Sequence, residues 1–131
     1  MVAALAVCCE QMARRSGGDP TTEAMTRLAE FKSNLREHRE SHRLFVEMLG
    51  VGLHNRAVAE GVIAFMRQDR ALVESLVREV IAVREDRSQA EAPALAAAIS
   101  AAVIGIIAQN LLDPEFAADA AVDALTAMAL K

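Results

Sequence analysis

Two histidines four residues apart, His38 and His42, show the spacing in this chain that most suggests chemistry. On a helix they would lie on one face, where two imidazoles can share a metal ion. Their neighbours Arg36, Arg39 and Arg43 would surround such a cation with positive charge. We therefore expect a solvated, charged helix face here and no metal site.

The two cysteines, Cys8 and Cys9, are adjacent and cannot cross-link distant segments. A redox sensor would need Arg14 or Arg15 to stabilise a thiolate, whereas cysteine more commonly serves as a small buried hydrophobe. The chain has no glycine-rich phosphate loop, no nucleophile elbow and no paired carboxylates in an apolar setting, and Ser100 lies among alanines. We expect no catalysis, no cofactor and a reducing, cytoplasmic location.

Methionine and phenylalanine side chains are the better functional candidates. Flexible thioethers and a few phenyl rings make an adaptable cavity lining, although filling the core is the commoner role for any single one of them. Ser100, Gln109 and Asn110 are the polar groups best placed to orient a ligand. Because little charge points inward, we expect an apolar or neutral ligand. The residues expected to bind it are Met12, Phe31, Phe45, Met48, Phe65, Met66 and Asn110.

The composition predicts one helical domain to hold these residues. The chain has 131 residues and a hydrophobic fraction of 53%, with four Phe, no Tyr and no Trp, so its core must be aliphatic. Sustained period-two alternation and Asn-Gly or Asp-Gly turns are absent from the sequence. We expect an all-α bundle of about five or six helices spanning residues 1–131.

Glycine, proline and capping residues divide the chain into helices. A first helix over 2–15 would end at two glycines, and Asp19 would cap a second that begins at Pro20 and carries a Glu23–Arg27 ion pair. The polar stretch 36–43 is either a solvated helical turn or a break near Ser41 that caps the next helix. The apolar stripe that follows comprises Leu44, Phe45, Met48, Leu49 and Leu53.

The second half begins with the longest predicted element. Asn55 would cap a helix running over 56–84, and a polar connection over 85–92 leads to Pro93. The helix over 94–108 is apolar on every side, so we expect it to be buried all round. Asp113-Pro114 would end it and start an amphipathic last helix. Its expected apolar face comprises Ala118, Ala121, Val122, Leu125 and Met128.

Two features suggest that the last two helices pair with a second copy of the chain. Ala101 and Gly105 are four apart and allow close helix approach, and the last helix offers a flat face of alanines. Two such hairpins would form a four-helix bundle across a two-fold axis, although a core within one chain is the alternative. The expected dimer-interface residues are Ile99, Val103, Gly105, Ile106, Ala121, Leu125 and Met128.

Charge and length argue against nucleic acid and membrane as direct partners. The formal net charge is −4, and residues 88–131 carry one basic and five acidic side chains. Phosphate binding needs a basic face, so any contact with DNA must come from elsewhere. The apolar run over 94–108 is shorter than the roughly 18 to 20 residues that span a bilayer, so we expect no transmembrane helix.

The run AAAISAAVIGIIAQNLLDPEFAADAAVDALTAM, after a long helix ending REVIAVRED, resembles the C-terminal ligand-binding and dimerisation domain of TetR-family transcriptional regulators. The resemblance covers about residues 3–130, with Gly105 and the turn Leu111–Pro114 as its clearest points. It implies a ligand cavity among the middle helices and a dimer through the last two. It covers no helix-turn-helix domain, so DNA binding is expected of the parent protein only.

The resemblance implies a sensor, in which a small effector shifts the first helix and so changes the spacing of two DNA-binding heads, as in a repressor. The alternatives are a helical interaction module without a ligand and, behind it, a small helical enzyme. A cavity with convergent polar groups would favour the sensor.

Overall fold

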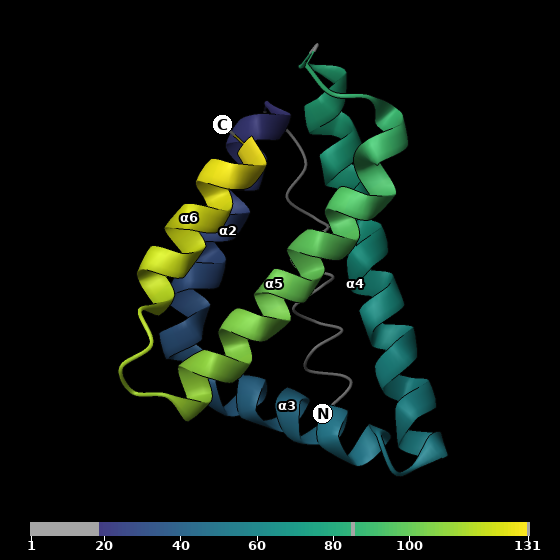
Figure 1. Ribbon diagram of the computed structural model, residues 1–131, viewed down its shortest axis with the longest axis vertical. Helices are drawn as coiled ribbons and strands as arrows, with labels where there is room; N and C mark the ends of the chain where they lie inside the picture. Colours follow the sequence, from purple (N-terminus) through teal and green to yellow (C-terminus); the bar gives the residue numbers. More distant parts are fainter. Residues whose placement is uncertain (1–18, 85, 131) are drawn as a thin grey trace.

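The computed structural model describes residues 19–84 and 86–130, and every regular element within these ranges is helical (Figure 1). The predicted all-α fold is confirmed. The expected first helix over 2–15, with Cys8, Cys9 and Met12, lies outside the described residues. The helices are α2 (Pro20–Glu37), α3 (Arg39–Gly52), α4 (Arg56–Ala82), the short 3-10 helix η1 (Gln89–Glu91), α5 (Ala92–Leu112) and α6 (Ala118–Leu130).

Side-chain caps begin two of these helices where the sequence predicts them. The Asp19 carboxylate accepts a hydrogen bond from the Thr22 backbone amide at 3.1 Å, and proline occupies the first turn of α2. The Asn55 side chain accepts from the Val58 amide at 3.2 Å and starts α4, the longest helix at 27 residues. Each cap satisfies a backbone donor that has no partner within the helix.

Three predicted boundaries need correction. The break in the polar stretch falls at His38, which separates α2 from α3 without a side-chain cap, and Ser41 lies inside α3. The last helix starts at Ala118 rather than directly after Pro114, because residues 113–117 form a turn in which the Asp113 carboxylate accepts from the Glu115 amide at 2.9 Å. Helix α4 ends at Ala82, two residues before the predicted boundary.

The helices enclose a triangle (Figure 1). Helices α4 and α5 pack together near the η1 end and diverge, and α3 crosses the base between them. Helix α6 runs back beside α2 and packs on both α2 and α5. Two ion pairs join α2 to α6, Lys32 to Asp123 at 2.7 Å and Arg36 to Asp119 at 3.6 Å.

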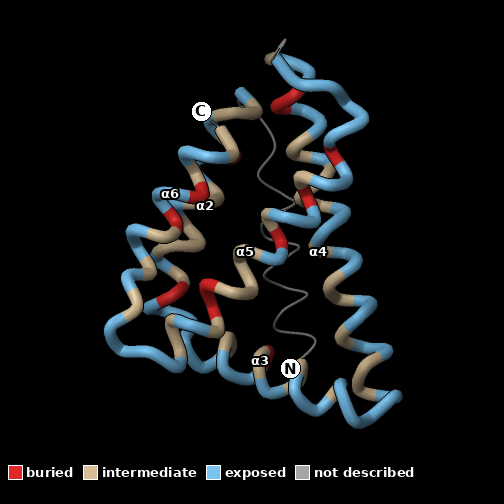
Figure 2. The backbone as a smooth tube through the Cα atoms, in the orientation of Figure 1, coloured by how far each residue is buried: buried red, intermediate tan, exposed pale blue. Residues whose placement is uncertain are grey.

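The core is concentrated where α2, α5 and α6 meet. Its buried members are Leu35, Ile106, Ile107, Val122 and Leu125. A second buried group, where the end of α4 meets the start of α5, comprises Val80, Ile81, Ala92 and Ala96. Away from that end, α4 has no buried residue (Figure 2). The predicted α3 stripe is only partly covered, since Phe45 is buried but Leu53 is 81% exposed.

Candidate functional site

Two of the predicted ligand-site residues contact each other where α3 meets α4. Phe45 of α3 is buried, and its ring centroid lies 5.4 Å from that of Phe65 of α4, with the planes inclined by 64°. This edge-to-face contact is a favourable geometry for aromatic rings. Phe65 keeps part of its surface accessible, so the pair has one ring enclosed and one partly open.

The other predicted apolar lining residues are divided between two places. Phe31 of α2 packs against the core formed by α2, α5 and α6, which places it with Leu35 rather than with the phenylalanine pair. Met48 of α3 and Met66 of α4 are both half-buried and lie within one turn of Phe45 and Phe65 respectively. Met12 lies outside the described residues.

Asn110 has a different partner from the ligand expected for it. Its side-chain amide donates to the Leu35 carbonyl at 3.3 Å, which joins the end of α5 to the end of α2. The Arg39 guanidinium donates to the Asn110 and Leu111 carbonyls at 3.2 and 3.3 Å. The two Arg39 bonds satisfy carbonyls that the last turn of α5 leaves free. The corner between α2 and α3 is thus attached to the end of α5.

Sequence reasoning missed Asp69. Every turn of α4 has at least one residue that is not exposed, and within residues 67–71 that residue is Asp69. It follows Phe65 by four residues, so both belong to the covered face. Burial raises the pKa of the Asp69 carboxyl, an effect that the nearby Arg70 opposes. The signal was present in the spacing, because Asp69 continues the apolar series Val58, Val62, Phe65 and precedes Leu72, Leu76 and Val80.

Among the buried polar atoms without a hydrogen-bond partner in the described residues are Ser100 Oγ on α5 and His42 Nδ1 on α3. Ser100 was expected to face a ligand, and its free hydroxyl is compatible with that role. The expectation of a solvated face is wrong for His42, which is half-buried, whereas His38 is exposed. Among residues 19–84 and 86–130, no group of three or more His, Cys, Asp or Glu is arranged to hold a metal ion.

The half-buried imidazole predicts that stability falls in mild acid. Burial, and then the nearby His38, lower the pKa of His42 below 6.5. The unfolded chain therefore takes up a proton at a higher pH than the folded one, and folding stability falls as pH drops below about 6.5. In urea titrations at pH 7.5 and 5.5, we expect the midpoint to fall less in His42→Leu than in the native chain. An equal fall in both would show that His42 does not cause it.

The apolar helices α5 and α6 are only partly covered within one chain. Five of the 21 residues of α5 are buried, so the expectation of complete burial is wrong for a single chain. Ile106 and Leu125 were expected at a dimer interface, but both are buried in the core beneath α2. Val103 and Ala121 also pack against that core. Ile106 and Leu125 thus contribute their surface to the core of one chain, whereas Val103 and Ala121 are only partly buried there.

What remains on the outside of α5 and α6 is apolar. Met128 is 70% exposed and Leu112 is 80% exposed. A Cβ added at Gly105 would meet no other atom within 4 Å, so the space beside this glycine is open. Ile99, on the same helix, is only half-buried. The rest of this outer surface is mostly alanine. We call the whole surface the outer α5–α6 face. Its exposed members are Ala94, Ala97, Ala98, Ala101, Gln109, Leu112, Ala117, Ala120, Ala124, Ala127 and Met128.

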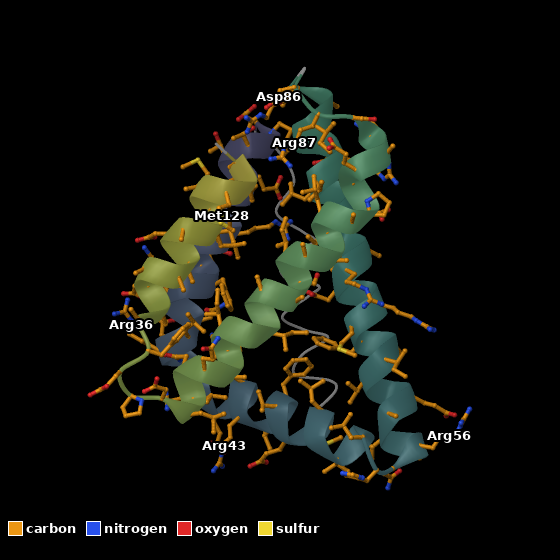
Figure 3. The ribbon with its side chains drawn as sticks, in the orientation of Figure 1. Arg36, Arg43, Arg56, Asp86, Arg87 and Met128 are labelled. Atoms are coloured by element: carbon orange, nitrogen blue, oxygen red, sulfur yellow. The ribbon has the colours of Figure 1, made fainter. Side chains whose placement is uncertain are left out.

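By length and composition alone, the helical stretch Gln89–Leu112 is long and apolar enough to cross a membrane. The run considered in the sequence is shorter because the helix extends beyond it at both ends. Core helices of soluble proteins pass the same test, so this is weak evidence for a span. Glu91 is the one charged residue of this stretch. Elsewhere, Arg36, Arg43 and Arg56 are directed away from the helix bundle (Figure 3).

One comparison with known proteins is informative. Residues 20–130 match the family model described as BetI-type transcriptional repressor, C-terminal. Neither a curated protein nor a solved structure matches the chain significantly. The matched range covers every described helix, and the family is one of regulators rather than enzymes. The helical architecture and this match together establish that the chain belongs to the BetI-type C-terminal domains of TetR-family transcriptional regulators.

Proposed function

We propose that residues 1–131 form one ligand-sensing and dimerisation domain that controls a DNA-binding module of the same regulator. The observation that carries the dimer is the outer α5–α6 face, because α5 has apolar residues on every side and one chain buries only four of them. Monomeric soluble proteins rarely leave a contiguous apolar surface of this kind uncovered. A second copy covers it by pairing two hairpins across a two-fold axis.

The proposed interface is narrower than the sequence suggested. Of the residues expected there, Ile106 and Leu125 are buried within one chain. The others retain accessible surface, namely Ile99, Val103, Gly105, Ala121 and Met128, and the exposed alanines complete the face. Small residues allow two helix backbones to approach closely, and the lack of charge along α5 avoids the cost of desolvating ionised groups.

The proposed ligand site lies between α3 and α4, at the Phe45–Phe65 pair with Met48 and Met66. It is supported by the incomplete cover of α4, whose inward residues from Val58 to Val77 are all only partly buried. A core packed to ordinary density would bury such a stripe. A small, largely apolar effector that occupies this position would tighten α4 against α3 and thereby shift the module that binds DNA.

Sedimentation equilibrium of the whole chain tests the dimer. We expect a mass twice that of the 14.1 kDa chain at tens of micromolar, without detergent. A monomer at that concentration would overturn the proposed dimer. A chain that stays in solution only with detergent would instead support a membrane role for Gln89–Leu112.

A further inference from the structure

Two hydrogen bonds from Arg39 join the start of α3 to the end of α5. The guanidinium uses both of its terminal nitrogens, which donate to the Asn110 and Leu111 carbonyls at 3.2 and 3.3 Å. The Asn110 side chain joins the same end of α5 to the Leu35 carbonyl of α2 at 3.3 Å. The two Arg39 bonds, which we call the Arg39 clamp, therefore connect the helix that carries Phe45 with the helix that carries most of the outer α5–α6 face.

The position of Arg39 is unfavourable for the helix to which it belongs. Arg39 is the first residue of α3, at the positive end of the helix dipole, and the N-cap residue His38 makes no side-chain capping bond. A cation in the first turn and a missing cap both destabilise a helix. The same guanidinium is favourable at the negative end of α5, where it satisfies free carbonyls. Arg39 therefore serves the contact between the helices rather than α3 alone.

The contact also depends on the shape of the arginine side chain. A planar guanidinium presents donors at fixed spacing and reaches two carbonyls at once, whereas an ammonium is a single point of charge. Because Arg39 is exposed, its bonds add little to stability, and their main effect is to fix the orientation of one helix end against the other. Arg43, one turn later, pairs with Glu40 on α3 itself and points away from the bundle (Figure 3).

The Arg39 clamp lies between the proposed ligand site and the proposed dimer interface. Phe45 follows Arg39 by six residues on α3, and Gly105 precedes Leu111 by six residues on α5. Six residues of helix span about 9 Å. Over such a length a helix moves as a rigid unit, so a shift at Phe45 displaces Arg39 and, through the clamp, the end of α5.

We propose that Arg39 is a positioning residue that couples α3 to the dimer interface on α5. Association of two chains fixes α5, and the Arg39 clamp passes that constraint to α3. Coupling between two sites is reciprocal, so an effector that changes the position of α3 also changes the association of the two chains, by the same factor. This inference rests on the proposed dimer and adds the route that links it to the proposed ligand site.

Hydrogen exchange followed by mass spectrometry tests the coupling. The native chain is compared with Gly105→Glu, in which a carboxylate at the interface is expected to separate the two chains. The readout is the exchange rate of amides within residues 42–52 of α3. We expect these amides to exchange about fivefold or more slowly in the native dimer than in the monomer. When Arg39→Gln is introduced into both chains, the ratio of the two rates should fall to near one.

Arg43→Gln is the matched control, because Arg43 is an exposed arginine of α3 whose ion pair stays within that helix. It should leave the ratio of rates at its native value. If Arg39 had only a local structural role, Arg39→Gln would speed exchange equally in dimer and monomer, and the unchanged ratio would overturn the proposal.

Sedimentation of the same samples separates failure of the coupling from failure of the dimer. Equal exchange of α3 in a native dimer and a Gly105→Glu monomer would overturn the coupling and leave the proposed dimer intact. A native chain that is monomeric, or a Gly105→Glu chain that stays dimeric, would overturn both the proposed interface and the coupling.

Discussion

Replacing Leu35 by alanine is expected to lower the free energy of unfolding by about 2 to 5 kcal/mol. Leu35 is 2% exposed and lies in the last turn of α2, where it contacts the core shared with α5 and α6. Truncation removes buried apolar area and leaves a cavity that its neighbours cannot easily fill, because the Asn110 bond to the Leu35 carbonyl holds the two helix ends together.

Urea unfolding followed by far-ultraviolet circular dichroism measures this loss, since the chain has no Trp or Tyr to report by fluorescence. Leu53→Ala is the control, because Leu53 is 81% exposed and should change the free energy by less than about 0.5 kcal/mol. Both variants must be compared at one protein concentration, since association adds to apparent stability. Equal losses in the two variants would contradict the position of the core.

Replacing Gly105 by glutamate is expected to convert the dimer into a monomer without unfolding the chain. A Cβ at Gly105 meets nothing within 4 Å in one chain, so the new side chain is accommodated there. In the dimer the same carboxylate would be buried against an apolar partner without a counter-charge, which costs several kcal/mol. Glutamate also favours helix over glycine by roughly 0.5 kcal/mol or more, so the monomer keeps its helix content.

Gly61→Glu is a closely matched control for that substitution. Gly61 also lies within a helix, and a Cβ there also meets nothing within 4 Å, but it belongs to α4 and lies away from the outer α5–α6 face. Sedimentation should show half the native mass for Gly105→Glu and the native mass for Gly61→Glu. A dimer retained by Gly105→Glu would exclude this face as the interface. Loss of the dimer in both variants would show that charge alone, rather than position, disrupts it.

The local features of the fold were predictable because they depend on residues within one turn of each other. The Asp19 and Asn55 caps and the Glu23–Arg27 ion pair, at 2.8 Å, all form as the spacing predicts. Asp69 was equally visible in the spacing of the α4 stripe. Its partial burial is apparent only from the structure, because burial depends on the other helices.

Helix α5 shows where local information ends. In α4 the spacing of apolar residues indicates which face is covered. The residues of α5 are apolar on every side, so their spacing does not indicate a covered face. The sequence alone establishes an all-helical chain with two apolar helices at its end that need cover. Only the packing of α2 and α6 determines that Ile106 and Leu125 are internal and that Gly105 and Met128 remain outside. The physical reason is that burial depends on contacts between residues far apart in the chain.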